Sequence, residues 1–503
     1  MSYRDNRTAS VSRRGFLGAV GLGALGSVPT GTAGAATLDD QYRTVVDVRD
    51  EGADASGGES VSALLADLVD DETLLRFPPG RYYMDAQVRA SGITNVGLVG
   101  DDATLVPADY DDFEGPTYRL FRLGTHYDPG RDICVADFDV DQRGTGTGIR
   151  AFHLSAADSL RLENVDIVGR HDSGTWGPVL VRVTDPGGSG VVSGVRMPDG
   201  ADWETETPGD LWRGPTGILV NDHRGHLTVR DCVVNNFPDN GLYVQGEGTV
   251  SVRGGRFANS GPVNVRIGAR EAAVEGATVV VDDRAPNYRA QIPMRFDYAE
   301  AVDVEGVDLA LATPNGDALQ LRGGVERATI RQSDVSIGAV PASGIVARRG
   351  SGPLSVVDVN IDIESSGNAI RALGDGGSLV VQGGHVGGGA TGETLRHAVR
   401  CERDGSEFRQ LTVDQWGGGR RRGLALLGDD AVVYDCRIQS SDWPVHARGT
   451  NVWVEDNYLN SYSGTGSIRI GPSADTVRVK NNELPDGIED DGGSAVLVTG
   501  TTY

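Results

Sequence analysis

The chain has 503 residues and a formal charge of −25, with 39% apolar residues and 72 glycines. Of its 46 basic residues, Lys480 alone is a lysine. Such an acidic chain lacks the basic footprint that phosphate binding needs, so we expect no nucleic acid among its partners. After residue 35 no stretch approaches the roughly 20 apolar residues of a spanning helix, and we expect no membrane span.

The first 35 residues have the pattern of an export signal. Arg13 and Arg14 precede residues 15–17 (GFL) and an apolar run rich in glycine and alanine, and residues 33–35 (AGA) offer a cleavage site. The segment resembles a twin-arginine signal, so we expect residues 1–35 to be removed and the protein to be secreted. The acidic, lysine-poor composition is similar to that of secreted proteins of halophilic archaea, because salt screens the self-repulsion of such a surface.

Residues 36–90 are expected to open the fold and to cap it. Within them, residues 60–69 (SVSALLADLV) have the apolar spacing of an amphipathic helix. A helix over the first coil of a β-structure would cover its exposed edge and prevent edge-to-edge association.

From residue 91 to residue 490 the sequence repeats a short unit, apolar-x-apolar-x-turn-x-x-apolar, about every 26 residues. LTVRDCVV (227–234) and VWVEDNYL (452–459) are two examples. Aligning the units stacks one turn position, and most of its residues tolerate a left-handed backbone or bond their own turn. This turn column consists of Asn95, Asp137, Asn164, Gly194, Asp231, Gly254, Gly276, Gly306, Gln332, Asp358, Gly383, Gln410, Asp435, Asp456 and Asn481.

Each repeat holds three short runs of alternating apolar and polar residues, with no helical periodicity between them. This pattern predicts an all-β fold, a single-stranded right-handed parallel β-helix of about 14 coils with three strands per coil and an N-terminal capping helix. A β-propeller would need four strands in blades of about 40 or more residues. Residues 491–503 are expected to form a C-terminal tail.

Over about residues 44–490 the chain resembles the pectin-lyase-like superfamily of right-handed β-helices. VVDVRDEGAD (45–54), FPPGRYYM (77–84) and NVGLVGDDATL (95–105) are similar to the opening of pectate-lyase-superfamily chains. The resemblance implies action on polysaccharides, with a binding groove over the third strand of each coil. VWVEDNYL is similar to a string beside the pectate-lyase groove, but it lacks the histidine of that string, so we interpret it as a repeat unit.

The outward positions of the third strands are rich in arginine. Over ten consecutive coils, eight of the 20 outward residues are arginine, where the composition predicts about two. Stacked like charges repel one another, so this column of arginines needs negatively charged partners. We expect an acidic polysaccharide to supply them, and the alternative is that neighbouring acidic side chains pair with the arginines. The candidate binding residues are Arg266, Arg371, Arg400, Glu402 and Arg448.

Long loops that lead into these strands carry aromatic residues. Residues 169–216 contain Trp176, Trp203 and Trp212, and residues 281–292 contain Tyr288. Aromatic faces stack on sugar rings, which makes these four residues candidates for substrate binding. The alternative is that they only hold their loops in place.

The first function that this pattern suggests is a lyase that cleaves a uronate polysaccharide by β-elimination. The candidate centre consists of Arg295, Asp297, Arg322 and Arg348, on three adjacent coils. Asp297 would orient an arginine or bind Ca²⁺, the candidate cofactor. Arg322 or Arg348 would act as the base, and the other would clamp the sugar carboxylate. The resemblance implies an Arg or Lys base, and Lys480 lies in a turn flank.

Two other functions stay open. Asn315-Gly316-Asp317 is faintly similar to the N-T-D motif of polygalacturonases, so a glycoside hydrolase is one alternative. A hydrolase needs two carboxylates at a set separation, whereas Asp297 and Glu402 lie four coils, about 19 Å, apart. A non-catalytic, adhesin-like protein is the other alternative and would bind glycan without cleaving it. In each case we expect a monomer.

Overall fold

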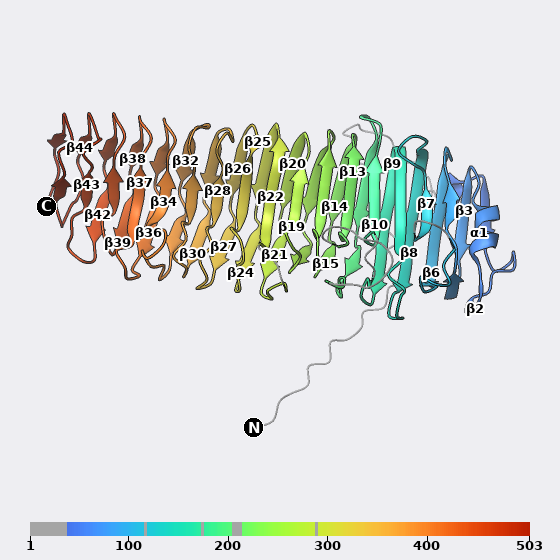
Figure 1. The fold of residues 1–503 in the computed structure, drawn as a ribbon. Coiled ribbons are helices and arrows are strands. Elements are labelled where there is room, and N and C mark those ends of the chain that lie inside the picture. Colours follow the sequence, from blue (N-terminus) through green and yellow to red (C-terminus); the bar gives the residue numbers. More distant parts are fainter. Residues whose placement is uncertain (1–37, 115–117, 173–175, 204–213, 287–289) are drawn as a thin grey trace, which may run out of the picture. The chain divides into compact units, whose positions relative to one another are not determined.

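The computed structural model describes residues 38–503, apart from residues 115–117, 173–175, 204–213 and 287–289. Residues 42–503 form one compact unit, and the short 3₁₀ helix η1 (Leu38–Gln41) belongs to a separate one. The larger unit is an all-β parallel solenoid of about 16 turns. Figure 1 shows its strands stacked coil upon coil. The predicted fold class is confirmed.

Every strand pairing in the solenoid is parallel, and the strands form three stacks. The first stack precedes the turn column. It contains β1 (Thr44–Asp47), β3 (Thr73–Phe77), β6 (Val96–Pro107), β8 (Gly130–Asp141), β9 (Arg150–Val168), β11 (Ser189–Ser193), β14 (His226–Arg230), β17 (Thr249–Arg253), β20 (Glu271–Glu275), β23 (Ala301–Glu305), β26 (Ala328–Arg331), β29 (Leu354–Val357), β32 (Leu379–Gln382), β35 (Glu407–Arg409), β38 (Val432–Tyr434), β41 (Trp453–Glu455), β44 (Arg478–Lys480) and β46 (Leu497–Thr499).

The second stack follows the turn column. It contains the later parts of β6, β8 and β9, together with β2 (Ser56–Ser60), β4 (Gly80–Met84), β12 (Arg196–Met197), β15 (Val233–Asn235), β18 (Arg256–Ala258), β21 (Thr278–Val281), β24 (Asp308–Leu311), β27 (Asp334–Ile337), β30 (Asn360–Ile363), β33 (His385–Gly387), β36 (Thr412–Gln415), β39 (Arg437–Ser440) and β42 (Tyr458–Ser461).

The third stack holds the candidate site. It contains the first part of β9, together with β5 (Val88–Ala90), β7 (Arg119–Leu123), β10 (Val179–Val183), β13 (Ile218–His223), β16 (Leu242–Gly246), β19 (Val263–Gly268), β22 (Ile292–Ala299), β25 (Leu319–Val325), β28 (Ile345–Ala347), β31 (Ile370–Ala372), β34 (His397–Cys401), β37 (Arg422–Leu426), β40 (Val445–Ala447), β43 (Ile468–Ile470) and β45 (Ile488–Asp490).

The solenoid begins earlier and ends later than the repeat pattern alone indicated. Strands β1 to β5 already pair with later strands, and they lie in the segment that we assigned to opening and capping. Strand β46, in the expected tail, pairs with β44. The one α-helix of the described residues, α1 (Ser62–Leu68), lies where the capping helix was expected, and Leu65 on it is fully buried. No helix of the described residues is long and apolar enough to cross a membrane.

The turn column has one backbone conformation throughout. All fifteen of its residues have positive φ values, from 49° at Gln332 to 65° at Gly383. Side chains of the column also bond between coils: Asn164 Nδ2 donates to Asp137 Oδ1 at 2.9 Å. The left-handed conformation is costly for residues other than glycine, asparagine and aspartate, which explains the composition of the column.

A β-branched residue in this column should destabilise the fold. Asp456, with φ of 57°, is exposed. We expect Asp456→Val to lower the free energy of unfolding by about 1–2 kcal/mol, because valine strains the left-handed backbone. Asp456→Gly, the control, should change it by only a few tenths of a kcal/mol. Urea denaturation measures both, and equal losses in the two variants would contradict this explanation.

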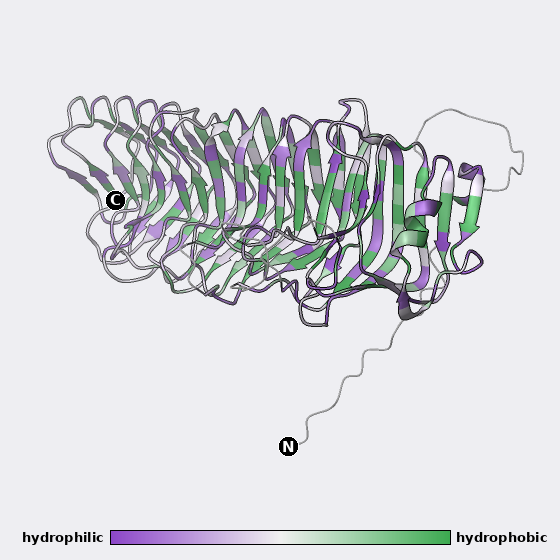
Figure 2. Ribbon diagram, turned by 45° about the vertical axis from the view of Figure 1, so that its right-hand side comes forward, coloured by the Kyte–Doolittle hydropathy of each residue, from purple (hydrophilic) through white to green (hydrophobic). Residues whose placement is uncertain are grey.

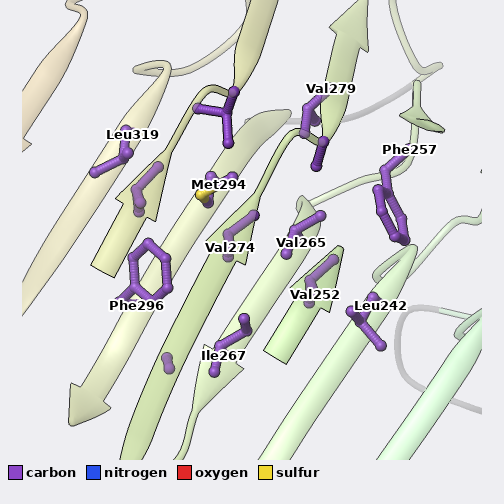
Figure 3. Packing of buried hydrophobic residues seen from close by; sticks show 14 of the residues in the cluster. Leu242, Val252, Phe257, Val265, Ile267, Val274, Val279, Met294, Phe296 and Leu319 are labelled. Atoms are coloured by element: carbon purple, nitrogen blue, oxygen red, sulfur yellow. The ribbon is translucent and has the colours of Figure 1, made fainter. Parts of the chain in front are cut away.

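The core is filled by the inward residues of all three stacks. Figure 2 shows hydrophobic and hydrophilic residues alternating along the strands. In Figure 3, Leu242, Val265 and Phe296 of the third stack pack with Val252 and Val274 of the first, and with Phe257 and Val279 of the second. Since the inward residues are buried, their neighbours on the third stack face outward, as the alternation predicts.

Candidate functional site

The outward residues of the third stack lie in register, one above another. The column runs in this order through Tyr243, Arg266, Arg295, Gln320, Val346, Arg371, Arg400, Ala425, His446 and Arg469. Adjacent coils are about 4.8 Å apart. Asp297, Arg322, Arg348, Glu402 and Arg448 each lie two residues further along the chain than a residue of the column. We call the column together with these five residues the arginine face.

Asp297 holds two arginines of this face. Arg266 Nε donates to Asp297 Oδ2 at 2.7 Å, and Arg295 Nε donates to Asp297 Oδ1 at 2.6 Å. Burial raises the pKa of Asp297, but the hydrogen bonds from the two guanidinium groups outweigh it, so the pKa lies below its ordinary value. Asp297 is therefore ionised and orients Arg295, which is one of the two roles expected of it.

Other arginines of the face also have acidic partners. Arg348 Nη2 lies 3.1 Å from Asp317 Oδ2, and Asp317 also accepts from Gln320 Nε2 at 2.9 Å. Arg400 Nη2 lies 2.7 Å from Glu402 Oε1. For these two pairs the structural alternative holds, because Asp317 beside the face and Glu402 within it supply the negative charge.

Three arginines of the face keep their charge unmatched. Arg322, Arg371 and Arg448 form no hydrogen bond or ion pair through their side chains with any described residue. Burial, and then repulsion from Arg295, lower the pKa of Arg322 below its ordinary value. Arg322 is exposed and lies one coil beyond Arg295, so it is the cation of the predicted centre that remains available to a ligand.

A hollow of about 280 Å³ adjoins the N-terminal end of the arginine face. Two aromatic rings lie in it, each against a guanidinium group. Arg150 lies 5.5 Å from the centre of the Trp176 ring, and Arg266 lies 4.3 Å from the centre of the Tyr243 ring. The lining consists of Arg150, Trp176, Gly177, Gly214, Thr216, Leu219, Asn221, Asp239, Tyr243 and Arg266.

A buried arginine cluster, formed by Arg119, Arg150 and Arg182 with half-buried Arg122 beside them, lies at this end of the third stack, and our sequence interpretation missed it. Arg150 is only 1% exposed. Its Nε donates to the Gly177 carbonyl at 2.7 Å, whereas its Nη1 and Nη2 have no partner among the described residues. Burial, and then repulsion from Arg122, lower the pKa of Arg119 to about 10. The sequence did contain a sign of this cluster: three successive strands of the third stack, β7, β9 and β10, each contain arginine.

His153 lies within the same cluster. Burial, and then repulsion from Arg150, lower its pKa to about 2, so the imidazole is neutral. Neither of its ring nitrogens has a partner among the described residues. The cluster therefore combines several cations with a neutral ring, and its one ion pair among the described residues joins Arg182 to the exposed Asp222 at 3.0 Å.

The predicted aromatic residues fall into two groups. Trp176 lines the hollow, and Trp203 is half-buried and is not among its lining residues in the described part of the chain. Trp212 and Tyr288 lie outside the described residues, as do the signal residues Arg13 and Arg14.

Binding of Ca²⁺ was the second of the two roles predicted for Asp297. Both of its carboxylate oxygens accept guanidinium N–H groups, so a Ca²⁺ ion there would have to displace two arginines. Over residues 38–503, leaving aside the four gaps, no group of three or more His, Cys, Asp or Glu side chains could hold a metal ion. The residues present at Asp297 do not fit a cation.

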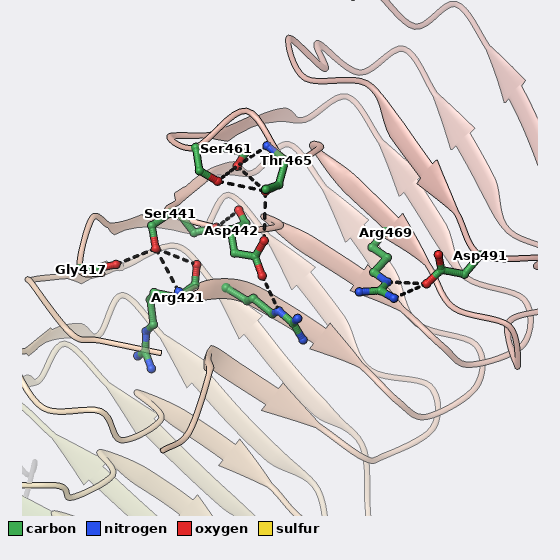
Figure 4. Close-up of polar contacts among 11 residues, drawn as sticks. Gly417, Arg421, Ser441, Asp442, Ser461, Thr465, Arg469 and Asp491 are labelled. Carbon is green, nitrogen blue, oxygen red and sulfur yellow. Dashed lines mark hydrogen bonds and ion pairs between the residues drawn. The ribbon is translucent and has the colours of Figure 1, made fainter. Parts of the chain in front are cut away.

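The C-terminal part of the face has a polar network of its own. Asp442 accepts from buried Arg422 at 2.8 Å and from Thr465 at 3.0 Å, and Arg469 pairs with Asp491 (Figure 4). Burial, and then repulsion from Arg422, lower the pKa of His446 to about 4. The imidazole is thus neutral near pH 7, but it lies six coils, about 29 Å, from Asp297.

Comparisons with known proteins give distant similarities. No protein-family model matches the chain. A stretch of 202 residues is 30% identical to an α-1,3-galactosidase A from Peterkaempfera griseoplana, and it covers 37% of this chain and 24% of that protein. The chain thus spans about a quarter of the length of this curated relative.

Two solved structures have a similar fold. One is the surface adhesin PfbA of Streptococcus pneumoniae, with 12% identity, a TM-score of 0.39 and coverage of 90% of this chain and 93% of that one. The other is the A-module of a mannuronan C-5 epimerase of Azotobacter vinelandii, with 11% identity, a TM-score of 0.24 and coverage of 92% and 97%. At these values the similarities say nothing about activity.

Proposed function

We propose that this protein is an exported polysaccharide lyase that cleaves an acidic, uronate-containing polysaccharide lying along the arginine face. The observation that carries the proposal is the environment of Arg322. This exposed arginine has no partner among the described residues, and it lies one coil from Arg295, which Asp297 holds in place. β-Elimination requires one cation that neutralises the sugar carboxylate and a second group that accepts a proton. Arg295, held in place by Asp297, suits the first role, and Arg322, with its lowered pKa and no acidic partner among the described residues, suits the second.

Each role follows from the chemistry of the step. Arg295 neutralises the carboxylate of a uronate residue, which makes the proton at C5 more acidic. Arg322, in its neutral form, accepts that proton. The C5–H electron pair forms a double bond between C4 and C5, the bond from C4 to the glycosidic oxygen breaks, and this oxygen takes a proton from water. Arg348, held by Asp317, clamps the neighbouring sugar.

The rate should rise with pH over the range in which the fold persists. Only the neutral guanidine accepts a proton, and its fraction grows as the pH approaches the lowered pKa of Arg322. We expect the rising limb of kcat to move to lower pH in Arg322→Lys, because a lysine has a lower ordinary pKa, about 10.4. A pH series of initial rates measures both. A rate that falls above about pH 6 would instead indicate a protonated acid and would contradict this assignment.

A glycoside hydrolase remains the second candidate function. The partial similarity to an α-1,3-galactosidase favours it. Against it, Asp297, Asp317 and Glu402 all accept hydrogen bonds from arginines of the face, which leaves none of these carboxylates free to serve as a general acid.

One assay separates these functions. The purified mature protein is incubated in high salt with a panel of acidic polysaccharides, with and without Ca²⁺, and near-ultraviolet absorbance and reducing ends are recorded. A rising absorbance reports the C4–C5 double bond and supports the lyase. New reducing ends without absorbance would indicate hydrolysis, and neither signal, with salt-sensitive binding, would indicate a protein that only holds glycan. Either of the last two results would overturn the proposal.

A further inference from the structure

We propose that Arg150, which lines the hollow, forms with its neighbours Arg119 and Arg182 an anion-binding subsite that takes one carboxylate group of an acidic sugar. The identity of the ligand as a sugar rests on the proposed function. The subsite itself rests on the geometry of the buried arginine cluster, which lies outside the predicted catalytic centre.

The first argument is charge. Arg119, Arg150 and Arg182 are each at most 9% exposed, and Asp222 is their one ion-pair partner among the described residues. Removing a cation from water without a partner is costly, so an unmatched buried cluster favours an anion that binds there. Asp239, the acidic residue of the lining, has its Oδ2 engaged by Thr216 and Asn240.

The second argument is a comparison with another fully buried arginine of the same chain. Arg403 is 2% exposed, and its Nη1 donates to the carbonyls of Gly352 and Gly377 at 3.0 and 2.9 Å. Its Nη2 donates to the carbonyl of Arg348 and to Ser351. In Arg403 both terminal nitrogens are satisfied by the protein, whereas both terminal nitrogens of Arg150 are not. A guanidinium with two free, buried donors is suited to bidentate binding of a carboxylate.

The third argument concerns the residues that surround Arg150 in the hollow. Arg150 lines the hollow together with the rings of Trp176 and Tyr243, and aromatic faces of this kind stack on sugar rings. Arg266, at the other end of the lining, is held by Asp297 and so connects the hollow to the predicted centre. One glycan chain could therefore place a carboxylate at Arg150 and extend over the arginine face.

The test uses the full mature protein with two probes at constant ionic strength, galacturonate monosaccharide and inorganic sulfate. Binding is followed by calorimetry and by tryptophan fluorescence, to which Trp176 contributes. We expect the wild type to bind galacturonate, and Arg150→Met to weaken it by at least about tenfold, the effect of one lost charge-assisted hydrogen bond. Arg437→Met, an exposed arginine on the second stack, should bind as the wild type does.

Melting temperatures show whether a variant loses binding only because its fold is destabilised. Without ligand, Arg150→Met should melt at or above the temperature of the wild type, because an apolar side chain replaces an unmatched buried charge. Arg403→Met should melt well below it. A drop in Arg150→Met as large as that in Arg403→Met would show a structural role and overturn the proposal.

The other possible results of the binding experiment also test the proposal. Binding of sulfate without galacturonate would point to a site for free inorganic anions and overturn the assignment to a sugar, as would equal binding of galacturonate by wild type and Arg150→Met. Arg322→Ala should bind galacturonate normally. If that variant and the wild type bind it while no polysaccharide is cleaved, the lyase proposal fails and the subsite stands.

Discussion

Replacing Arg322 by alanine should lower kcat for elimination by about 10²–10⁴-fold, the usual contribution of a general base. The guanidine of Arg322 is the group that accepts the C5 proton, and no other described arginine of the centre is free of an acidic partner. The value of KM should change little, since Arg295 and Arg348 still hold the sugar. Initial rates of absorbance increase, measured over a range of polysaccharide concentrations, separate the two constants.

A matched substitution controls for general effects on this arginine-rich surface. Arg437→Ala removes an exposed arginine that stacks on Tyr458 in the second stack, away from the arginine face. It should leave kcat unchanged. If Arg322→Ala retained more than about a tenth of the wild-type rate, the base would have to be another group, and Arg322 would at most contribute binding.

Replacing Arg403 by methionine should cause the largest loss of stability, about 3–5 kcal/mol in the free energy of unfolding. Arg403 donates to acceptors on the turns after β28 and β31, the strands of the two preceding coils, and so ties successive coils together. Each buried carbonyl that loses its donor costs about 1–3 kcal/mol. Denaturation in urea, followed by far-ultraviolet circular dichroism, measures the loss.

Arg150→Met is the matched control for this prediction, because both substitutions remove a fully buried guanidinium. Arg150 loses one hydrogen bond, to the Gly177 carbonyl, and its unmatched charge disappears as well. The two variants should therefore differ by several kcal/mol. Equal losses would mean that burial of the side chain, rather than its hydrogen bonds, sets the stability.

The fold was predictable because its signals are local. A left-handed residue at each turn can be recognised from the residue type alone, and all fifteen positions of the turn column have positive φ. The alternation of apolar residues likewise indicates which residues of β19 and β22 face the core. Strand β2 was missed because it contains no apolar residue.

The candidate site was only partly predictable, because its charges are matched between coils. The alignment placed Arg266, Arg295 and Asp297 on one face, but the sharing of Asp297 by two arginines depends on side-chain conformation. Arg119 and Arg150 were missed for a different reason. Each is the first residue of its strand and lies two positions before a buried phenylalanine, Phe121 or Phe152. The alternation therefore assigns each of these positions to the core, where an arginine is not expected.

The most direct test of the central claim is a crystal structure of Arg322→Ala with a bound uronate oligosaccharide, since this variant should bind without cleaving. The account predicts a glycan along the arginine face, with one carboxylate against Arg150 in the hollow and another against Arg295. A glycan bound over the first or second stack, or bound to the arginine face with its carboxylates directed to solvent, would contradict it.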